Sequence, residues 1–177
     1  MSTLSVNTIT AETGNTVSLA SGKSLSVPAG VHSPGSVIQT IQQPYTTASG
    51  ISSTSYIATG LSQVITPKFA TSKILVLVNL SAETYQAGNL SPKFYLQILR
   101  GTTEIAYRRS DSYAGVANNN YYSFSVHGTM NYLDSPSTTN AVTYSVNGKL
   151  SSTTNSATLR LHDSSSMSTI TLMEIAQ

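Results

Sequence analysis

The sequence lacks cysteine, and this absence excludes disulfide bonds, a thiolate nucleophile and a metal site built on cysteine. It also lacks tryptophan, and its charged residues make up only 9% of the chain, against about 25% in an average soluble domain. The net charge of +2 comes from few groups, which are too sparse for the clustered Lys and Arg that bind nucleic acid. We therefore expect neither cysteine-dependent chemistry nor a nucleic-acid partner.

Long hydrophobic runs are missing as well. The most apolar run covers residues 74–78 and is far shorter than a membrane-spanning helix. The first residues show no basic segment followed by an apolar one, so no secretory signal is visible. We expect a chain that is made in the cytosol and does not insert into a membrane.

Uncharged polar residues take the place of the missing charges. Ser and Thr together make up roughly 30% of the chain. Thr favours the half-buried surface of a sheet and Ser favours turns, and no segment of useful length has the helical period. The length of 177 residues suits one domain with a sizeable core plus a short appendage. The composition therefore predicts an all-β protein with one main domain.

The run at residues 74–78 predicts the central strand of the fold, buried on both faces, because it is continuously apolar between polar boundaries. Segments of alternating apolar and polar residues surround it; in the last one, Ile170, Leu172 and Glu174 are expected on one face. We expect strands at residues 36–42, 55–59, 61–66, 73–83, 93–100, 104–107, 121–134, 141–146, 157–161 and 168–175. About ten short strands without intervening helices predict an antiparallel sandwich, and a jelly roll fits this number best.

Residues 1–34 form a segment of a different kind. Short apolar, polar, apolar units separated by Gly turns predict a β-rich N-terminal arm, and a Pro- and Gly-rich linker separates it from a head domain of residues 35–177. A ribbon of two or three short strands is marginal in water. We expect the arm to form a trimer stalk with copies of itself or to dock on another protein; a flexible leader is the alternative.

The candidate ligand-binding residues gather in one loop. Tyr rings stack on the C–H faces of sugars, and amides and carboxylates pair with hydroxyls, so a surface polysaccharide is one candidate ligand. Because Tyr is favoured at protein interfaces, the loop could equally form a contact within a homotrimer. An ordinary solvated loop is the third interpretation. The residues are Asp111, Tyr113, Asn118, Asn119, Asn120, Tyr121 and Tyr122.

Other titratable residues give weaker signals. Arg100, Arg108 and Arg109 form the main basic concentration, and the last two would face opposite sides of a strand. A salt bridge at a subunit contact is therefore favoured over a ligand site. His127 and the pair that begins at His162 have no further ligand at metal spacing, and the serines after His162 have no nucleophile elbow around them. We expect no metal, no cofactor and no catalytic residue.

Four segments of the chain resemble sequences that recur in structural proteins of tailed phages, especially phages of cyanobacteria and marine bacteria. The segments are residues 33–42, 69–79, 133–146 and 168–176, and the likeness extends over the chain from residue 35 onward. The resemblance implies a virion protein whose compact domain is similar to the trimeric jelly roll of the C1q and tumour-necrosis-factor type. It also implies an N-terminal piece that docks on the particle and a C-terminal head that faces outward.

We therefore expect a non-enzymatic virion structural protein, a homotrimeric tail-fibre or receptor-binding protein that contacts polysaccharide on the host surface. Because the arm is short where an adhesive fibre has a long shaft, a capsid decoration (cement) protein or a small head fibre is the alternative. An enzyme such as a polysaccharide depolymerase needs a carboxylate pair in a cleft. The seven acidic residues are scattered along the chain and give no sign of such a pair.

Overall fold

The computed structural model describes residue 21 and residues 32–87, 93–110, 121–162 and 166–177, without the side chains of residues 86, 87 and 121–126. The described part is all-β, as the composition predicted, and belongs to a compact unit of residues 32–177. Its elements are β1 (Val37–Tyr45), β2 (Ser49–Ile51), β3 (Ile57–Ile65), β4 (Lys73–Ala87), β5 (Phe94–Arg100), β6 (Thr103–Ser110), β7 (Tyr121–Asp134), β8 (Val142–Leu150), a 3-10 turn η1 (Thr154–Ser156), β9 (Thr158–Leu161) and β10 (Ser168–Ile175). The arm expected over residues 1–34 lies almost entirely outside the described residues and stays a prediction, as does the domain boundary.

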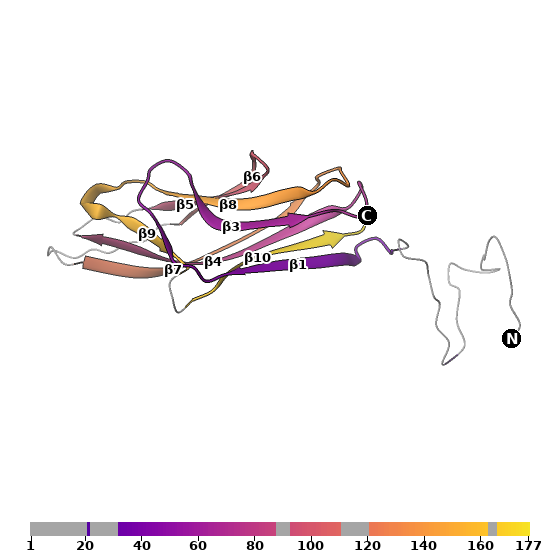
Figure 1. The fold of residues 1–177 in the computed structure, drawn as a ribbon, viewed down its shortest axis with the longest axis horizontal. Coiled ribbons are helices and arrows are strands. Elements are labelled where there is room, and N and C mark those ends of the chain that lie inside the picture. Colours follow the sequence, from indigo (N-terminus) through magenta and orange to yellow (C-terminus); the bar gives the residue numbers. More distant parts are fainter. Residues whose placement is uncertain (1–20, 22–31, 88–92, 111–120, 163–165) are drawn as a thin grey trace, which may run out of the picture. The chain divides into compact units, whose positions relative to one another are not determined.

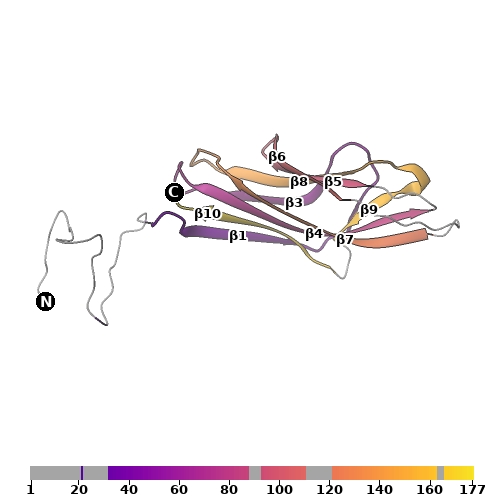
Figure 2. The ribbon, with the colours of Figure 1, turned by 180° about the vertical axis from the view of Figure 1, so that it is seen from behind.

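Two antiparallel sheets pack face to face in the layers seen in Figure 1 and, from behind, in Figure 2. The first sheet has the order β1-β10-β4-β9-β2, with β7 on the other edge of β4. Within it, β10 pairs with the first half of β4 and β9 with a later part. The second sheet has the order β3-β8-β5-β6. Every ladder is antiparallel, which confirms the predicted sandwich.

The strand pairing is that of a jelly roll. With the short strands β2 and β9 set aside, the first long strand pairs with the last, the second with the second last, and so on inward: β1 with β10, β3 with β8, β4 with β7, and β5 with β6. Such nested antiparallel pairs arise when one long hairpin is rolled over itself into two sheets. The predicted fold class is confirmed.

The central position predicted for residues 74–78 is confirmed, because β4 has neighbours on both edges. Burial on both faces is wrong for the single chain. Ile74, Val76 and Val78 are at most 3% exposed, whereas Leu75 and Leu77 are only half-buried on the outer face of the sheet. The sandwich has one inner face per sheet, so alternate residues of even its central strand point outward.

The predicted alternation of inward and outward residues is confirmed for β5 and β10, the two strands in which the sequence shows it most clearly. Leu96 and Ile98 of β5 are fully buried, as are Ile170 and Leu172 of β10. Glu174 shares the inner face of β10 and is 0% exposed. The core between the sheets is built from these residues together with others from both layers: Leu61, Ile65, Ile74, Leu80, Phe94, Tyr144, Val146, Leu150, Leu159 and Leu161.

The strand boundaries differ from the prediction around β3. The sequence predicted two strands, at residues 55–59 and 61–66, where the structure has one that passes through Gly60. Gly60 has a φ of +92°, a conformation that L side chains rarely adopt, and the pairing with β8 shifts its register between Ala58 and Ser62. A bulge at this glycine therefore continues a strand that its sequence pattern interrupts.

The chain enters the sandwich through a tight turn. Pro34 and Gly35 occupy the middle of it, Gly35 has a φ of +83°, and Ser36 N–H donates to Ser33 O at 3.0 Å. Pro followed by Gly at positive φ is the residue pair of a type II turn. Gly35 N–H then donates to Ala176 O at 2.8 Å, and Ala176 N–H donates to Ser36 O at 2.9 Å. This exchange ties the segment before β1 to the end of β10.

Candidate functional site

The loop predicted to bind a ligand falls outside the described residues. This applies to Asp111, Tyr113, Asn118, Asn119 and Asn120. Tyr121 and Tyr122 begin β7, where the backbone pairs with the end of β4 and the side chains are not described. The glycan and trimer-contact interpretations of this loop both stay predictions.

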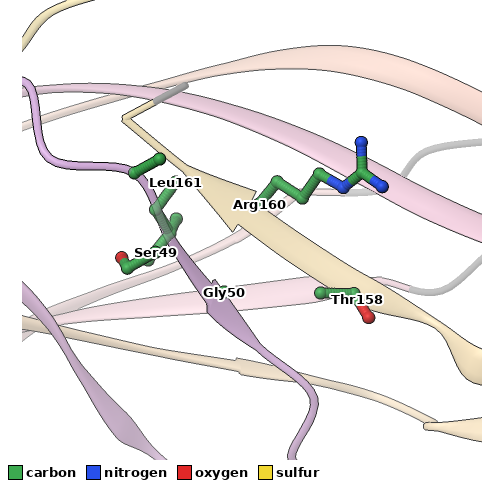
Figure 3. A pocket seen from close by; sticks show the side chains of 6 residues that line it. Ser49, Gly50, Thr158, Arg160 and Leu161 are labelled. Atoms are coloured by element: carbon green, nitrogen blue, oxygen red, sulfur yellow. The ribbon is translucent and has the colours of Figure 1, made fainter. Parts of the chain in front are cut away.

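A pocket of about 420 Å³ lies along the short ladder between β2 and β9. Figure 3 shows Ser49 and Gly50 on β2 beside Thr158, Arg160 and Leu161 on β9, with the Arg160 side chain pointing away from β2. Arg160 is the one ionisable residue among those that line it, which are Ala48, Ser49, Gly50, Thr158, Arg160 and Leu161. A serine without a base beside it has no means of activation.

The guanidinium of Arg160 is held by its own chain. It lies 3.7 Å from the Glu83 carboxylate and 4.1 Å from the centre of the Tyr85 ring. An ion pair and a cation–π contact on the outer face of the first sheet thus already use this charge. The pocket offers a shallow surface of small side chains without a catalytic pair.

A histidine and a serine come together inside the sandwich, and neither reaches solvent. His162 Nδ1 lies 2.7 Å from Ser168 Oγ, and His162 Nε2 lies 2.7 Å from Thr59 O. A carbonyl only accepts, so Nε2 donates to it, and in the neutral ring Nδ1 then accepts from the Ser168 hydroxyl. Ser168 Oγ in turn accepts from Ser81 N–H at 2.9 Å.

This histidine network is structural. His162 is 1% and Ser168 0% exposed, so no substrate can reach the hydroxyl. Each polar atom already has a partner, which removes the cost of burying it. The network joins β9 and β10 to β3 of the opposite sheet and gives a physical reason for a histidine at this buried position.

The three arginines expected at a subunit contact, Arg100, Arg108 and Arg109, do not share one site. Arg100 Nη1 donates to both carboxylate oxygens of Asp134 at 3.0 Å, so the salt bridge lies within one chain and the intersubunit prediction is wrong for this residue. Arg108 donates to Thr129 O of β7. Arg108 and Arg109 occupy adjacent positions of β6 and so face opposite sides, as predicted.

Asp134 is the centre of a buried charge network at the end of β7. It is 5% exposed, and its second partner is the Tyr144 hydroxyl, which donates to Oδ2 at 2.6 Å. Burial raises the pKa of Tyr144 well above its usual value, and the hydrogen bond to Asp134 and the negative charge there raise it further. Tyr144 therefore stays a neutral donor that holds the carboxylate in place.

Glu174 is a second buried carboxylate with a full set of donors. Oε2 accepts from Gln39 Nε2 at 2.6 Å, and Oε1 accepts from the N–H groups of Lys68 and Phe69 at 2.7 and 3.2 Å. Burial alone raises the pKa of Glu174, but the hydrogen bonds from Gln39 and the two backbone N–H groups outweigh it, so the net pKa lies below the ordinary value. The ionised group fastens the segment before β4 to β1 and β10.

The outer face of the first sheet carries a group of apolar residues that we name the aliphatic face. The register places Met173, Leu75 and Leu133 in one row across β10, β4 and β7. Val37 and Leu133 are 49% and 47% exposed, and the others are half-buried. The aliphatic face comprises Val37, Leu75, Leu77, Leu133, Met173 and Ile175. A connected apolar surface of this kind is typical of a contact site.

The outer face of the second sheet has a different chemistry, with three tyrosines, two amides and a lysine side by side. We name it the aromatic face; it comprises Tyr56, Tyr95, Gln97, Tyr107, Asn147 and Lys149. Each strand by itself shows only one or two of these residues. The register between strands brings the group together, so no single segment of the sequence reveals it.

The described residues contain no group of three or more His, Cys, Asp or Glu that could hold a metal ion. Among the same residues, no helix has the length and apolar character needed to cross a membrane.

Comparison with known proteins identifies no family. No protein-family model matches the chain, and no curated protein matches it significantly. Solved structures do match, among them the insecticidal delta-endotoxin Cry8Ea1 from Bacillus thuringiensis, with 14% sequence identity and a TM-score of 0.37. That alignment covers 72% of this chain and 19% of the endotoxin chain, so the aligned segment is a small part of the endotoxin. A likeness this weak carries no argument about function.

Proposed function

We propose that the protein is a non-enzymatic structural component of a phage virion, a homotrimeric tail-fibre or receptor-binding protein that contacts the host surface. The segments that resemble phage structural proteins support the virion location. The jelly-roll fold of the described residues is compatible with the head domain of such a protein. In this role the N-terminal arm docks on other virion proteins and the head faces outward.

The aliphatic face is the observation that best supports a homotrimer. It is one connected surface on the first sheet. Leu75 and Leu77 of the central strand belong to it and are only half-buried within one chain. Between Lys73 and Glu83, the outward residues of β4 are uncharged. Few ions would have to lose water when such a surface packs against a copy of itself, so association costs little desolvation. Closed symmetry is the usual result of such contacts.

The second sheet stays outside in this arrangement. If copies meet through the aliphatic face, then β3, β8, β5 and β6 form the outer layer of each subunit. A surface-binding role fits a molecule with one face for its copies and another for a ligand.

Imaging and composition of purified particles test the proposed role. We expect mass spectrometry to find the protein in virions of the phage that encodes it, and labelled-particle imaging to place it on the tail in groups of three. A copy number near that of the capsid lattice would assign the alternative role of a capsid decoration protein or head fibre. Absence from the particles would refute both.

A further inference from the structure

The aromatic face is arranged in two adjacent rows across the second sheet. In one row Lys149 of β8 pairs with Tyr95 of β5, and Tyr56 precedes β3 at its near end. In the next row Asn147 pairs with Gln97, and Gln97 pairs with Tyr107 of β6. Strands lie about 4.8 Å apart, so four strands make a surface about 14 Å wide, enough for a short stretch of a sugar chain.

The first row is held together by contacts of the lysine. Lys149 Nζ lies 4.4 Å from the centre of the Tyr56 ring and 5.3 Å from that of the Tyr95 ring. Burial raises the pKa of Tyr56, and the charges of Glu104, Tyr95 and Tyr107 add to the rise, as expected for groups that lie close together. The rings and the ammonium group thus form one preorganised cluster.

The second row has an amide with unused hydrogen-bonding capacity. Gln97 is only 8% exposed, yet within the described part of the chain its side chain makes no hydrogen bond. Asn147 beside it is likewise without a side-chain partner among those residues. Neither amide is among the described buried polar atoms that lack a partner, so the polar atoms of both side chains reach solvent and can bind a ligand. A ligand rich in hydroxyl groups would supply hydrogen-bond partners for these two amides and would pack against the exposed ring of Tyr107.

We infer that the aromatic face binds a polysaccharide that contains acidic sugar units. Sugar rings present C–H faces that stack on Tyr56, Tyr95 and Tyr107, and hydroxyl groups that pair with the amides of Gln97 and Asn147. Lys149 makes no ion pair with any described residue and lies at the centre of the first row, where it complements a carboxylate on the sugar. The inference rests on the proposed host-surface role and names the surface that performs it.

Single-stranded nucleic acid is the other ligand that uses exposed rings and cations on a sheet. It requires a positive groove that follows the phosphates, with several cations along the strand. In the two rows Lys149 and Arg109 are the cations, and Glu104 lies close to the same cluster. This balance favours a ligand with sparse negative charge, as in a polysaccharide with acidic units.

Binding to purified full-length protein tests the inference without the virion. The probes are polygalacturonate and alginate as acidic polysaccharides, dextran as a neutral one, and oligo-dT as single-stranded DNA, measured by calorimetry. The variants are Tyr107→Ala, at a residue that is 73% exposed and whose replacement should therefore leave the fold intact, and Lys149→Gln. Tyr132→Ala is the matched control, since that tyrosine is 39% exposed on β7 of the first sheet.

We expect the wild type to bind at least one acidic polysaccharide and to bind dextran more weakly. Tyr107→Ala should weaken binding about tenfold, as loss of one stacking contact predicts. Lys149→Gln should weaken binding to the acidic polymer and reduce its dependence on salt, and Tyr132→Ala should have no effect.

The inference is overturned if the wild type binds no acidic polysaccharide, if it binds dextran equally well, if Tyr107→Ala binds as the wild type does, or if oligo-dT is the tighter ligand. The particle experiment decides the virion role separately. A protein found on the tail that fails to bind polysaccharide would keep the proposed function and lose this inference, and a binder that is absent from particles would do the reverse.

Discussion

Replacement of Glu174 by Gln tests the account of the buried carboxylate most directly. Its two oxygens accept from different donors. Oε1 accepts from the N–H groups of Lys68 and Phe69, and Oε2 accepts from Gln39 Nε2. A glutamine at this position has one oxygen and one NH₂ group. If its oxygen keeps the two backbone donors, its NH₂ group faces the NH₂ group of Gln39.

The expected cost follows from this conflict. Gln39 cannot turn its amide round freely, because the same Nε2 also donates to Thr66 O at 2.8 Å. The variant therefore loses one hydrogen bond to a charged group and leaves two donors opposed. A loss of this kind lowers the free energy of unfolding by about 1–3 kcal/mol.

The loss should depend on pH, with a sign set by the lowered pKa of Glu174. The unfolded chain takes up a proton near the ordinary glutamate pKa of 4.5, whereas the folded chain holds the carboxylate ionised to lower pH. Between the two pKa values the unfolded state binds more protons, so stability rises with pH. The contribution of Glu174 is complete above the unfolded value and is lost as pH falls through the folded one.

Urea unfolding of wild type and Glu174→Gln near neutral pH and again below pH 4.5 measures both effects. Protein concentration must be the same throughout, because association adds to apparent stability. The gap in unfolding free energy should be largest near neutral pH and should narrow in acid. Glu104→Gln, at an exposed position, is the control and should change stability by less than about 0.5 kcal/mol. A gap that is independent of pH, or no larger than that of the control, would refute the reasoning.

Three further changes test other parts of the structure. Leu75→Glu puts a charge on the aliphatic face and should abolish trimers without unfolding the chain, as light scattering and circular dichroism would show; Thr143→Glu, on the opposite sheet, should leave the mass unchanged, and a Leu75→Glu variant that stays trimeric would rule out this interface. Tyr144→Phe removes the hydroxyl that donates to a buried carboxylate at 2.6 Å and should cost about 1–3 kcal/mol in urea unfolding; an unchanged midpoint would mean that this hydrogen bond adds nothing to stability. Ser168→Ala takes a donor from His162 Nδ1 and an acceptor from a backbone N–H, so its melting temperature should fall, and a variant as stable as the wild type would contradict the structural role of the network.

Local patterns in the sequence were enough to predict the fold class. The alternation along β5 and β10 has the period of a strand, so it assigns inner and outer faces before any pairing is known. It even places Glu174 on the inner face, against its charge. The short strand β2 was missed, because Ser49–Ile51 has too few residues to show a period. The interruption at Gly60 divided β3 for a similar reason, since a bulge conceals the alternation on either side.

Contacts between distant segments were beyond the reach of these patterns. His162 meets Thr59 across the sandwich, and Asp134 meets Arg100 from a different sheet. The aromatic face likewise depends on which residue of β5 stands opposite which residue of β8. Such pairings are set by strand register, which the hydrophobic pattern constrains only as to face and not as to partner.

The hydrogen bonds between residues 35–36 and Ala176 have a practical consequence. Gly35 N–H donates to Ala176 O, and Ala176 N–H donates to Ser36 O, so the two ends of the sandwich sequence lie side by side. From this end β4 extends over 15 residues, about 50 Å, to the opposite end of the sandwich, where Ala87 pairs with Tyr121. A purification tag or fluorescent protein fused after residue 177 would emerge beside residue 35 and leave the distant rim unobstructed. Immobilising the molecule on a sensor through its C-terminus would thus orient every head the same way, with the rim toward the solution.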